Sequence, residues 1–307
     1  MPTPLTTLPA LALLLSAVPL PCRGQAPPRA SSVAAIDGEF SVDGRRLYLR
    51  CTAGAAPTVL VDAGLGESSD SWRQIQDALP AGIALCVFDR AGYGRSEAGP
   101  LPRTQQRNAR ELHAAAAAAG LRGPFVLVGH SLGGLNALAF VAEYRNSVAG
   151  LVLLDPPPRA WLEQQRPADT WQMFLDASRD LDAQATAAER DADPAARAPA
   201  RQLRAMASEH RSVIDEGAAT YARLGTLGEI PTIVLAAERP NPAFGDSAPA
   251  FQRLWIAENR RLAGLSRRGE LRLLSGRGHS MNREAPAEVV TAIRDMVSLL
   301  RGDATRP

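Results

Sequence analysis

The sequence predicts an α/β protein with a doubly wound, mostly parallel sheet and an inserted helical cap. Short apolar runs, as expected of strands buried on both faces, alternate with segments whose apolar residues recur at helical spacing. This alternation is typical of a parallel sheet covered by helices. One stretch, 159–229, interrupts it, because Ala, Arg, Asp, Glu and Gln dominate there and aromatic residues are scattered. We therefore expect a core in two parts, 39–158 and 230–302, with the cap between them.

The expected strands and helices follow the order that such a sheet needs. The first two strands, 39–42 and 45–51, are joined at Asp43-Gly44, a strong hairpin signal. Three prolines at 156–158 follow a strand at 148–154 and force the chain out of the sheet. The remaining strands are expected at 57–62, 83–88, 126–128, 230–236 and 270–274, and helices around 72–79, 111–113, 135–141, 251–262 and 285–300.

The first 26 residues differ from the rest and predict a secretory signal peptide. The apolar run Leu8 to Leu20 is shorter than the roughly 20 residues that cross a bilayer. Small residues at Gly24 and Ala26 are typical of a cleavage site, and a Pro/Ala/Ser-rich linker, 27–38, follows. We therefore expect a secreted or periplasmic mature protein without a membrane span.

Removal of the signal peptide would also remove Cys22. Cys51 and Cys86 would then be the only cysteines left, each in a predicted core strand. An even pair in an oxidising compartment is a candidate disulfide. Two buried free thiols are the alternative.

Composition excludes several classes of function. The 307 residues are 46% hydrophobic, enough for a full core, and no long polar tract divides them, which favours one large domain. With 34 basic and 32 acidic residues, the net charge of +2 indicates neither nucleic acid nor an acidic membrane as partner. Three cysteines and four histidines without Cys-x-x-Cys or His-Glu-x-x-His predict no metal site. Two short glycine-rich segments lack the third small residue of a dinucleotide-binding loop: Gly64-Leu65-Gly66 and Gly92-Tyr93-Gly94. The nucleotide-binding pattern Gly-Lys-Ser/Thr does not occur either. No cofactor is therefore expected. The expected partner is a small-molecule substrate, and the oligomeric state stays open.

The most informative short motif is Gly-x-Ser-x-Gly around Ser131. A predicted buried strand, 126–128, precedes it, and an apolar, Ala-rich stretch, 135–141, follows it. This is the strand, sharp turn and helix of a nucleophile elbow, in which Gly129 and Gly133 leave room for a very tight turn. Ser131 is therefore the candidate nucleophile.

A serine hydroxyl needs a base to take its proton, and His279 is the best candidate. It follows the last predicted strand, which fits the chain order serine, acid, histidine of this kind of site. His130 is expected to be buried beside the serine and to point elsewhere. His113 lies in a helix before the nucleophile, and His210 lies in the predicted cap.

Three carboxylates are candidates for the acid that orients His279. Asp155 ends the strand after the elbow, and Glu238 stands just past the next strand, at the same edge of the sheet. Asp246 lies further along that loop. Asp155 is favoured over Glu238 and Asp246, and all three stay open on the residues alone.

An acyl-transfer site also needs two donors aimed at the developing oxyanion. The backbone N–H of Leu132, directly after the nucleophile, is expected to be one. The loop Gly64-Leu65-Gly66, after the strand at 57–62, is expected to supply the other, from Leu65.

Four motifs together give the chain a family resemblance. They read Asp-Arg-Ala-Gly-Tyr-Gly-Arg-Ser at 89–96, Gly-His-Ser-Leu-Gly-Gly at 129–134, Leu-Val-Leu-Leu-Asp at 151–155 and Gly-Arg-Gly-His at 276–279. In this combination the chain resembles a bacterial branch of the α/β-hydrolase superfamily, over about residues 39–300. The resemblance implies a central eight-stranded sheet and a Ser-acid-His triad, but no particular substrate.

The sequence departs from the commonest pattern of that superfamily at two places. Many relatives begin the oxyanion loop with His-Gly, where this chain has Ala63-Gly64; a backbone donor does not depend on that side chain. An aspartate is usual two or three residues after the seventh strand, but Arg239, Pro240 and Asn241 stand here. The second departure favours Asp155 as the acid.

The leading hypothesis is a serine hydrolase that cleaves a carboxylic ester, with amide or lactone cleavage as close variants. A cofactor-free haloperoxidase or a C–C bond hydrolase would use the same triad. Epoxide and haloalkane hydrolysis are disfavoured, because those members use a carboxylate nucleophile and position 131 is serine. A non-catalytic binding protein on a hydrolase scaffold is the alternative from a different class.

Overall fold

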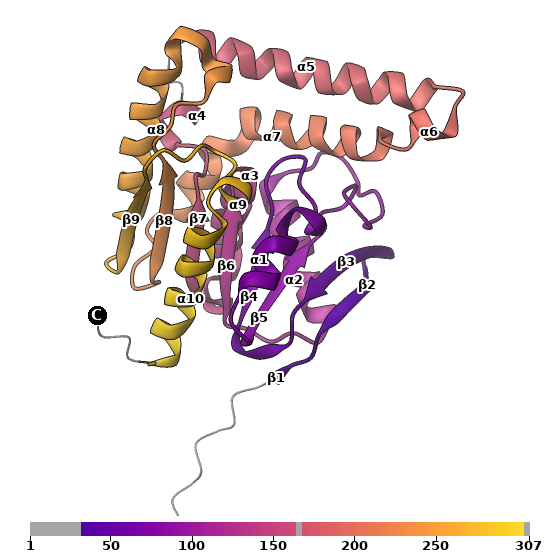
Figure 1. Ribbon diagram of the computed structural model, residues 1–307. Coiled ribbons are helices and arrows are strands. Elements are labelled where there is room, and N and C mark those ends of the chain that lie inside the picture. The colour runs from indigo at the N-terminus through magenta and orange to yellow at the C-terminus, as the bar shows by residue number, and fades with distance from the viewer. Residues whose placement is uncertain (1–31, 164–167, 304–307) are drawn as a thin grey trace, which may run out of the picture. The chain divides into compact units, whose positions relative to one another are not determined.

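The computed structural model describes residues 32–163 and 168–303 (Figure 1). The predicted signal peptide, with Cys22, lies outside the described residues. The predicted linker, 27–38, is described only from Ser32 onward.

A single mixed sheet forms the centre of the described chain, with strand order β2-β3-β5-β4-β6-β7-β8-β9. β2 pairs antiparallel with β3 and β3 antiparallel with β5, and the other neighbours along this order are parallel. The predicted doubly wound, mostly parallel eight-stranded sheet is confirmed. The strands are β2 Ile36–Val42, β3 Arg45–Cys51, β4 Gly54–Asp62, β5 Gly82–Phe88, β6 Phe125–His130, β7 Val148–Leu154, β8 Thr232–Ala237 and β9 Gly269–Leu274.

The sheet begins earlier in the chain than predicted. A ninth, two-residue strand, β1 Ser32–Val33, pairs antiparallel with β4, and β2 starts at Ile36 rather than at Glu39. Both additions fall in the range predicted as linker. The backbone of β3 offers hydrogen-bond partners as far as Cys51, which faces Ile36, so the hairpin ladder continues past the short apolar signal.

Helices cover both faces of the sheet. Neighbouring strand residues alternate between the faces: Leu60 and Leu127 pack on the side of α2 and α3, whereas Val61 and Val128 pack on the side of α1 and α10. Burial on both faces explains why central strands such as β5 and β6 read as continuous apolar runs. The helices of the core are α1 Arg73–Ala78, α2 Gln105–Ala118, α3 Leu132–Tyr144, α8 Ala248–Ala263, α9 Met281–Glu284 and α10 Pro286–Arg301, with 3₁₀ turns η1 Ser69–Trp72, η2 Arg145–Ser147 and η3 Pro242–Ser247.

Local signals set several of these helix ends. The Thr104 side chain accepts a hydrogen bond from the Arg107 N–H and so caps the start of α2. Pro286 occupies the first turn of α10, as predicted, where its missing N–H is not needed. Gly302 ends that helix in the left-handed conformation, with φ of 72°.

The inserted helices between β7 and β8 form the predicted cap. They are α4 Arg159–Leu162, α5 Ala168–Arg190, α6 Pro194–Arg197 and α7 Ala200–Leu224. The two long helices, α5 and α7, pack side by side, and α7 also contacts α3, the helix that follows the elbow (Figure 1).

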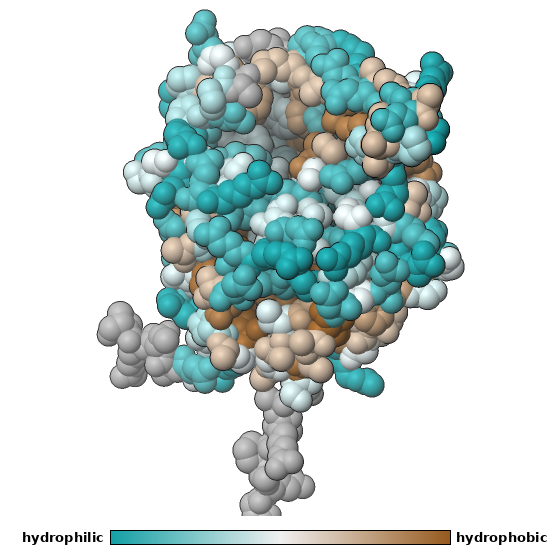
Figure 2. Space-filling model, turned by 45° about the vertical axis from the view of Figure 1, so that its right-hand side comes forward, coloured by the Kyte–Doolittle hydropathy of each residue, from teal (hydrophilic) through white to brown (hydrophobic). Residues whose placement is uncertain are grey.

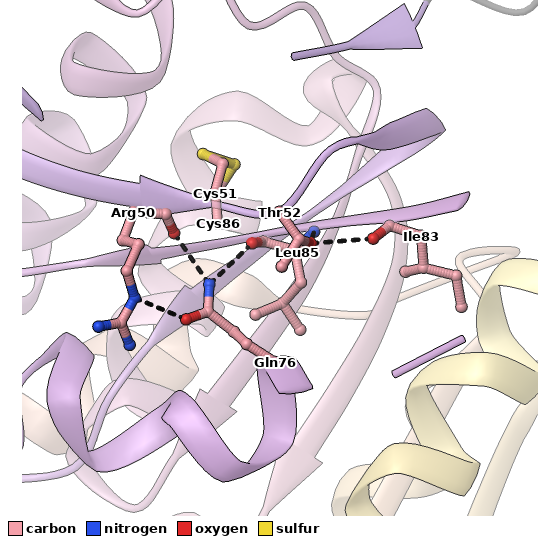
Figure 3. Close-up of a disulfide and its surroundings, with 7 residues drawn as sticks. All are labelled: Arg50, Cys51, Thr52, Gln76, Ile83, Leu85 and Cys86. Atoms are coloured by element: carbon pink, nitrogen blue, oxygen red, sulfur yellow. Dashed lines mark hydrogen bonds between the residues drawn. A yellow bond between two sulfur atoms is a disulfide. The ribbon is translucent and has the colours of Figure 1, made fainter. Parts of the chain in front are cut away.

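The predicted cysteine pair is joined by a disulfide (Figure 3). Cys51 of β3 and Cys86 of β5 face each other in the antiparallel register, so their side chains project from the same face of the sheet. Beside them, the Gln76 amide of α1 donates to the backbone carbonyls of Arg50 and Leu85, each at 3.1 Å (Figure 3). The disulfide therefore joins β3 and β5 at the point where Gln76 of α1 also hydrogen-bonds to both strands.

Candidate active site

The nucleophile elbow has the geometry that its sequence predicts. β6 ends at His130 and α3 begins at Leu132, with Ser131 between them at φ 51° and ψ −118°. A non-glycine residue in this region is strained, at a cost of about 1–3 kcal/mol. A Cβ on Gly133 would lie 2.0 Å from the Asp62 carbonyl oxygen, and one on Gly129 would lie 2.5 Å from the Gly133 carbonyl oxygen. The backbone therefore approaches too closely for any other residue at these two positions.

Ser131, His279 and Asp155 are joined by a chain of hydrogen bonds. His279 Nε2 lies 2.9 Å from Ser131 Oγ, and His279 Nδ1 lies 2.7 Å from Asp155 Oδ2. Asp155 is buried, and its other carboxylate oxygen accepts from the Ala237 N–H at 3.0 Å. His279 follows β9 in a loop, as expected, and is partly exposed. The arrangement can move a proton from the serine hydroxyl to an imidazole that a carboxylate holds in place.

The structure brings neither of the other two candidate acids to His279. Glu238 and Asp246 are both exposed, and no hydrogen bond joins either to His279 within the described part of the chain. Asp155 is close because β7 lies directly beside β6, so its carboxyl leaves the sheet next to the elbow. Its backbone lies in the left-handed region, at φ 49°.

The two predicted oxyanion donors lie on the same cavity as Ser131. Leu132 and Leu65 both line it, and no hydrogen bond to either N–H is formed by the residues that the structure describes. Leu132 is the first residue of α3, where N–H groups have no partner within the helix. Both N–H groups are therefore available to a carbonyl oxygen.

A buried arginine holds the oxyanion loop. The Arg90 guanidinium donates to the backbone carbonyls of Ala63 at 2.5 Å and Gly64 at 2.9 Å. It also forms ion pairs with Asp62 at 2.7 Å and with Glu209 of α7 at 2.8 Å. Burial alone would lower the pKa of Arg90, but the charges of Glu209 and Asp62 raise it well above its usual value. One cation thus fixes the loop carbonyls and ties them to the cap.

Glu209 is the centre of the contact between cap and core. Its carboxylate accepts from Arg90, from the Tyr93 hydroxyl at 2.6 Å and from the Asn108 amide at 3.0 Å. All of these side chains are buried. Burial raises the pKa of Asp62 to about 6, although Arg90 opposes this. We call these five residues, Asp62, Arg90, Tyr93, Asn108 and Glu209, the buried polar cluster.

A buried ion pair between Glu67 and His130 lies next to the elbow. His130 points away from Ser131, as expected: its Nδ1 lies 3.1 Å from Glu67 Oε2 and its Nε2 lies 2.9 Å from the His279 carbonyl oxygen. Both partners are acceptors, so the ring satisfies both only as the doubly protonated imidazolium. Burial lowers the pKa of His130, but Glu67 outweighs it and the pKa is raised. Burial likewise raises the pKa of Glu67, but His130 and the Gly64 N–H bring it down to about 2.

The Glu67–His130 pair joins three parts of the site. Glu67 belongs to the oxyanion loop, His130 precedes the nucleophile, and the carbonyl that His130 binds belongs to the catalytic-base candidate His279. Sequence reasoning did not find Glu67, Arg90 or Glu209. Arg90 lies within the motif at 89–96, which could have marked it as a candidate site residue. Its hydrogen-bond partners, however, lie 26 to 119 positions away in the sequence.

A cavity of about 420 Å³ lies over Ser131, between the cap and the carboxyl ends of the strands. One wall is aromatic, and the other carries the triad, the oxyanion loop and the Glu67–His130 pair. Phe174 of α5 and His210 of α7 line this cavity from the cap, so the cap lies over Ser131. The aromatic wall consists of Trp161, Phe174, Phe244, Phe251 and Trp255.

The surface outside the cavity is mainly hydrophilic on the face shown in Figure 2, where hydrophobic residues gather in a hollow in the upper part and again near the lower end. None of the helices in the described ranges combines the length and apolar character needed to cross a bilayer. Within residues 32–163 and 168–303, no group of three or more His, Cys, Asp or Glu is arranged to hold a metal ion.

Comparison with known proteins identifies the family. Residues 57–249 match the family model of the alpha/beta hydrolase fold. YqjL, an uncharacterised protein of Bacillus subtilis, is 28% identical over 118 residues, which are 38% of this chain and 47% of that protein. A Klebsiella pneumoniae protein named "putative carbamate hydrolase RutD" is 39% identical over 102 residues, 33% of this chain and 38% of that protein. The chain thus matches less than half the length of these curated relatives.

A solved structure supports the same conclusion for the fold. A haloalkane dehalogenase loop variant, DbeA-M1 from Bradyrhizobium elkanii, superposes with a TM-score of 0.66 over 88% of this chain and 100% of that chain, at 19% identity. The family model covers more than half of the present sequence, and the described chain has a mostly parallel central sheet, a sharp turn at Ser131 and inserted helices. The chain belongs to the α/β-hydrolase fold family.

Proposed function

We propose that this protein is a serine hydrolase that cleaves carboxylic esters, with amides and lactones as related substrates. One observation carries the proposal: the hydrogen-bonded chain Ser131–His279–Asp155 opens onto a cavity that also presents two free backbone N–H groups. Such a set of groups is complete for acyl transfer.

In the proposed reaction, Ser131 Oγ attacks the ester carbonyl while His279 Nε2 takes its proton. The oxyanion that forms accepts hydrogen bonds from the N–H groups of Leu65 and Leu132. His279 then protonates the leaving alcohol, and an acyl-enzyme remains on Ser131. Water, deprotonated by His279, releases the acid and restores the serine. Asp155 keeps the imidazole in the required tautomer and stabilises its protonated form.

Two features support a substrate that is cleaved at a carbonyl group and carries apolar groups. The aromatic wall of the cavity favours apolar groups on either side of the ester. The name of the RutD relative refers to a carbamate, which is also cleaved at a carbonyl group. Carbamates therefore belong in the same substrate screen as esters.

The test replaces Ser131 by Ala. We expect turnover of short chromogenic esters to vanish while the fold, followed by circular dichroism, is unchanged. Ser298→Ala, on α10 away from the cavity, serves as the matched control and should retain activity. A fluorophosphonate probe should label wild type at Ser131. Undiminished turnover by Ser131→Ala would exclude the proposal, and a folded wild type that resists the probe would favour a non-catalytic binding protein.

We also propose that the protein is exported. The observation in favour is the Cys51–Cys86 disulfide, because such bonds persist in oxidising compartments. Fractionation of cells that express the full sequence should recover a product shortened at its N-terminus outside the cytoplasm. Full-length protein with free thiols in the cytoplasm would contradict this proposal.

A further inference from the structure

The aromatic wall runs without interruption from His279 to the cap. The Trp255 ring meets His279 edge to face, with 5.8 Å between centroids, and Trp161 lies 6.3 Å from Trp255. Trp161 in turn meets Phe174 edge to face at 4.7 Å. Phe174 stacks on His210 of α7 at 3.7 Å. A group that lies along this wall from the scissile carbonyl therefore ends at His210.

His210 is the polar end of an otherwise apolar wall. It lines the cavity and is only 5% exposed, yet no hydrogen bond to its ring is formed within the described part of the chain, and its Nδ1 is buried without a partner. The two other histidines that line the cavity, His130 and His279, have both ring nitrogens hydrogen-bonded. A buried polar group without a partner costs free energy, which a ligand that supplies the partner recovers.

The surroundings of His210 define the kind of group it can receive. Burial, together with the charge of Arg211, lowers the pKa of His210 to about 4, so the imidazole is neutral near pH 7. A neutral imidazole has one donor and one acceptor nitrogen. A hydroxyl can serve either tautomer, because it both donates and accepts. An ammonium group would have to be buried there next to the like charge of Arg211, and a carboxylate would have to lose its hydration against the aromatic wall, both of which are costly.

We propose that His210 selects esters whose aromatic group carries a hydroxyl at its far end. The aryl ring would pack edge to face on the wall formed by Trp161, Phe174 and Trp255, and its hydroxyl would bond to the His210 ring. This inference rests on the proposed hydrolase function, and it names the substrate class of the same site.

The test compares two esters that differ by one hydroxyl, methyl 3-(4-hydroxyphenyl)propanoate and methyl 3-phenylpropanoate. For wild type we expect kcat/KM to be about tenfold higher for the hydroxylated ester, as one buried hydrogen bond can provide. In His210→Phe this ratio should fall to near one. His210→Gln, which keeps a donor and an acceptor, should retain part of the preference. Should the Phe variant not fold, His210→Leu removes the polar atoms and gives the same comparison.

A binding measurement separates this inference from the proposed function. The dissociation constants of the same two esters are measured on Ser131→Ala and on Ser131→Ala/His210→Phe by intrinsic tryptophan fluorescence. The hydrolase proposal itself is decided by the Ser131→Ala and fluorophosphonate experiments. If it fails there, tighter binding of the hydroxylated ester only when His210 is present would still support the role of His210. Equal preference with and without His210, or no preference in wild type by either measurement, would overturn the inference.

Discussion

Removal of the Glu209 carboxylate should damage both the stability and the activity of the protein. Glu209→Ala deletes the acceptor of three buried donors, on Arg90, Tyr93 and Asn108. The Arg90 guanidinium then keeps Asp62 as its only anionic partner within the described residues. Breaking a buried ion pair from one side typically costs about 3–5 kcal/mol. Because whole domains are stable by only about 5–15 kcal/mol, this loss would be a large fraction of the total.

Glu209→Gln gives an intermediate case. The amide oxygen can still accept from Arg90 and Asn108, and the tyrosine hydroxyl can accept from the amide nitrogen, so the shape and most contacts remain. The loss of charge next to Arg90 should cost about 1.5–3 kcal/mol, the range for hydrogen bonds to charged groups. The order of stability is therefore expected to be wild type, Glu209→Gln, Glu209→Ala.

The assay is equilibrium unfolding in urea, followed by tryptophan fluorescence, with kcat measured on the folded variants. Asp215→Ala, at an exposed position on the same helix, is the matched control and should change stability by less than about 0.5 kcal/mol. Because Arg90 also holds the carbonyls of Ala63 and Gly64, kcat should fall in Glu209→Ala more than KM rises. If Glu209→Ala is no less stable than Asp215→Ala, the reasoning about the buried polar cluster is wrong.

Three further predictions concern other parts of the structure. Asp155→Asn should lower kcat by about 10³–10⁴, because the side chain would no longer hold His279 in the required tautomer. The control, Glu238→Gln, should change kcat by less than about twofold. Equal losses of kcat in the two variants would reject Asp155 as the orienting acid. The depressed pKa of Glu67, about 2, means that its stabilisation is complete above pH 4.5 and is lost as pH falls through 2. The free energy of unfolding of wild type should therefore fall by about 3 kcal/mol more than that of Glu67→Gln over this range, and parallel curves from urea titrations at each pH would contradict it. Replacing Cys51 and Cys86 together by Ala opens a loop with a sequence separation of 35 and should cost about 3–4 kcal/mol; reduced wild type should approach the variant in thermal unfolding, and identical midpoints before and after reduction would count against the bond.

The sequence by itself determined the features that depend on local sterics and on burial. The elbow at 129–133 could be predicted because only glycine fits where the turning backbone meets Asp62 and its own helix. Central strands such as β5 and β6 could be predicted because burial on both faces leaves continuous apolar runs, whereas β2 and β3 could be predicted from the hairpin signal between them. His279 could be selected because it follows the last strand, at the sheet edge where Ser131 emerges.

The tertiary structure alone decided which groups meet across that edge. Asp155 and Glu238 both follow strands that end at the same edge, and only the adjacency of β7 to β6 places Asp155 against His279. The pairing of Arg90 with Glu209 joins residues 119 positions apart, through the way α7 lies on the core. Hydrophobic periodicity reports which face of an element is buried, but not which partner it is buried against. That choice depends on strand order and on the orientation of the cap, and it fixes the acid, the support of the oxyanion loop and the end of the substrate cavity at His210.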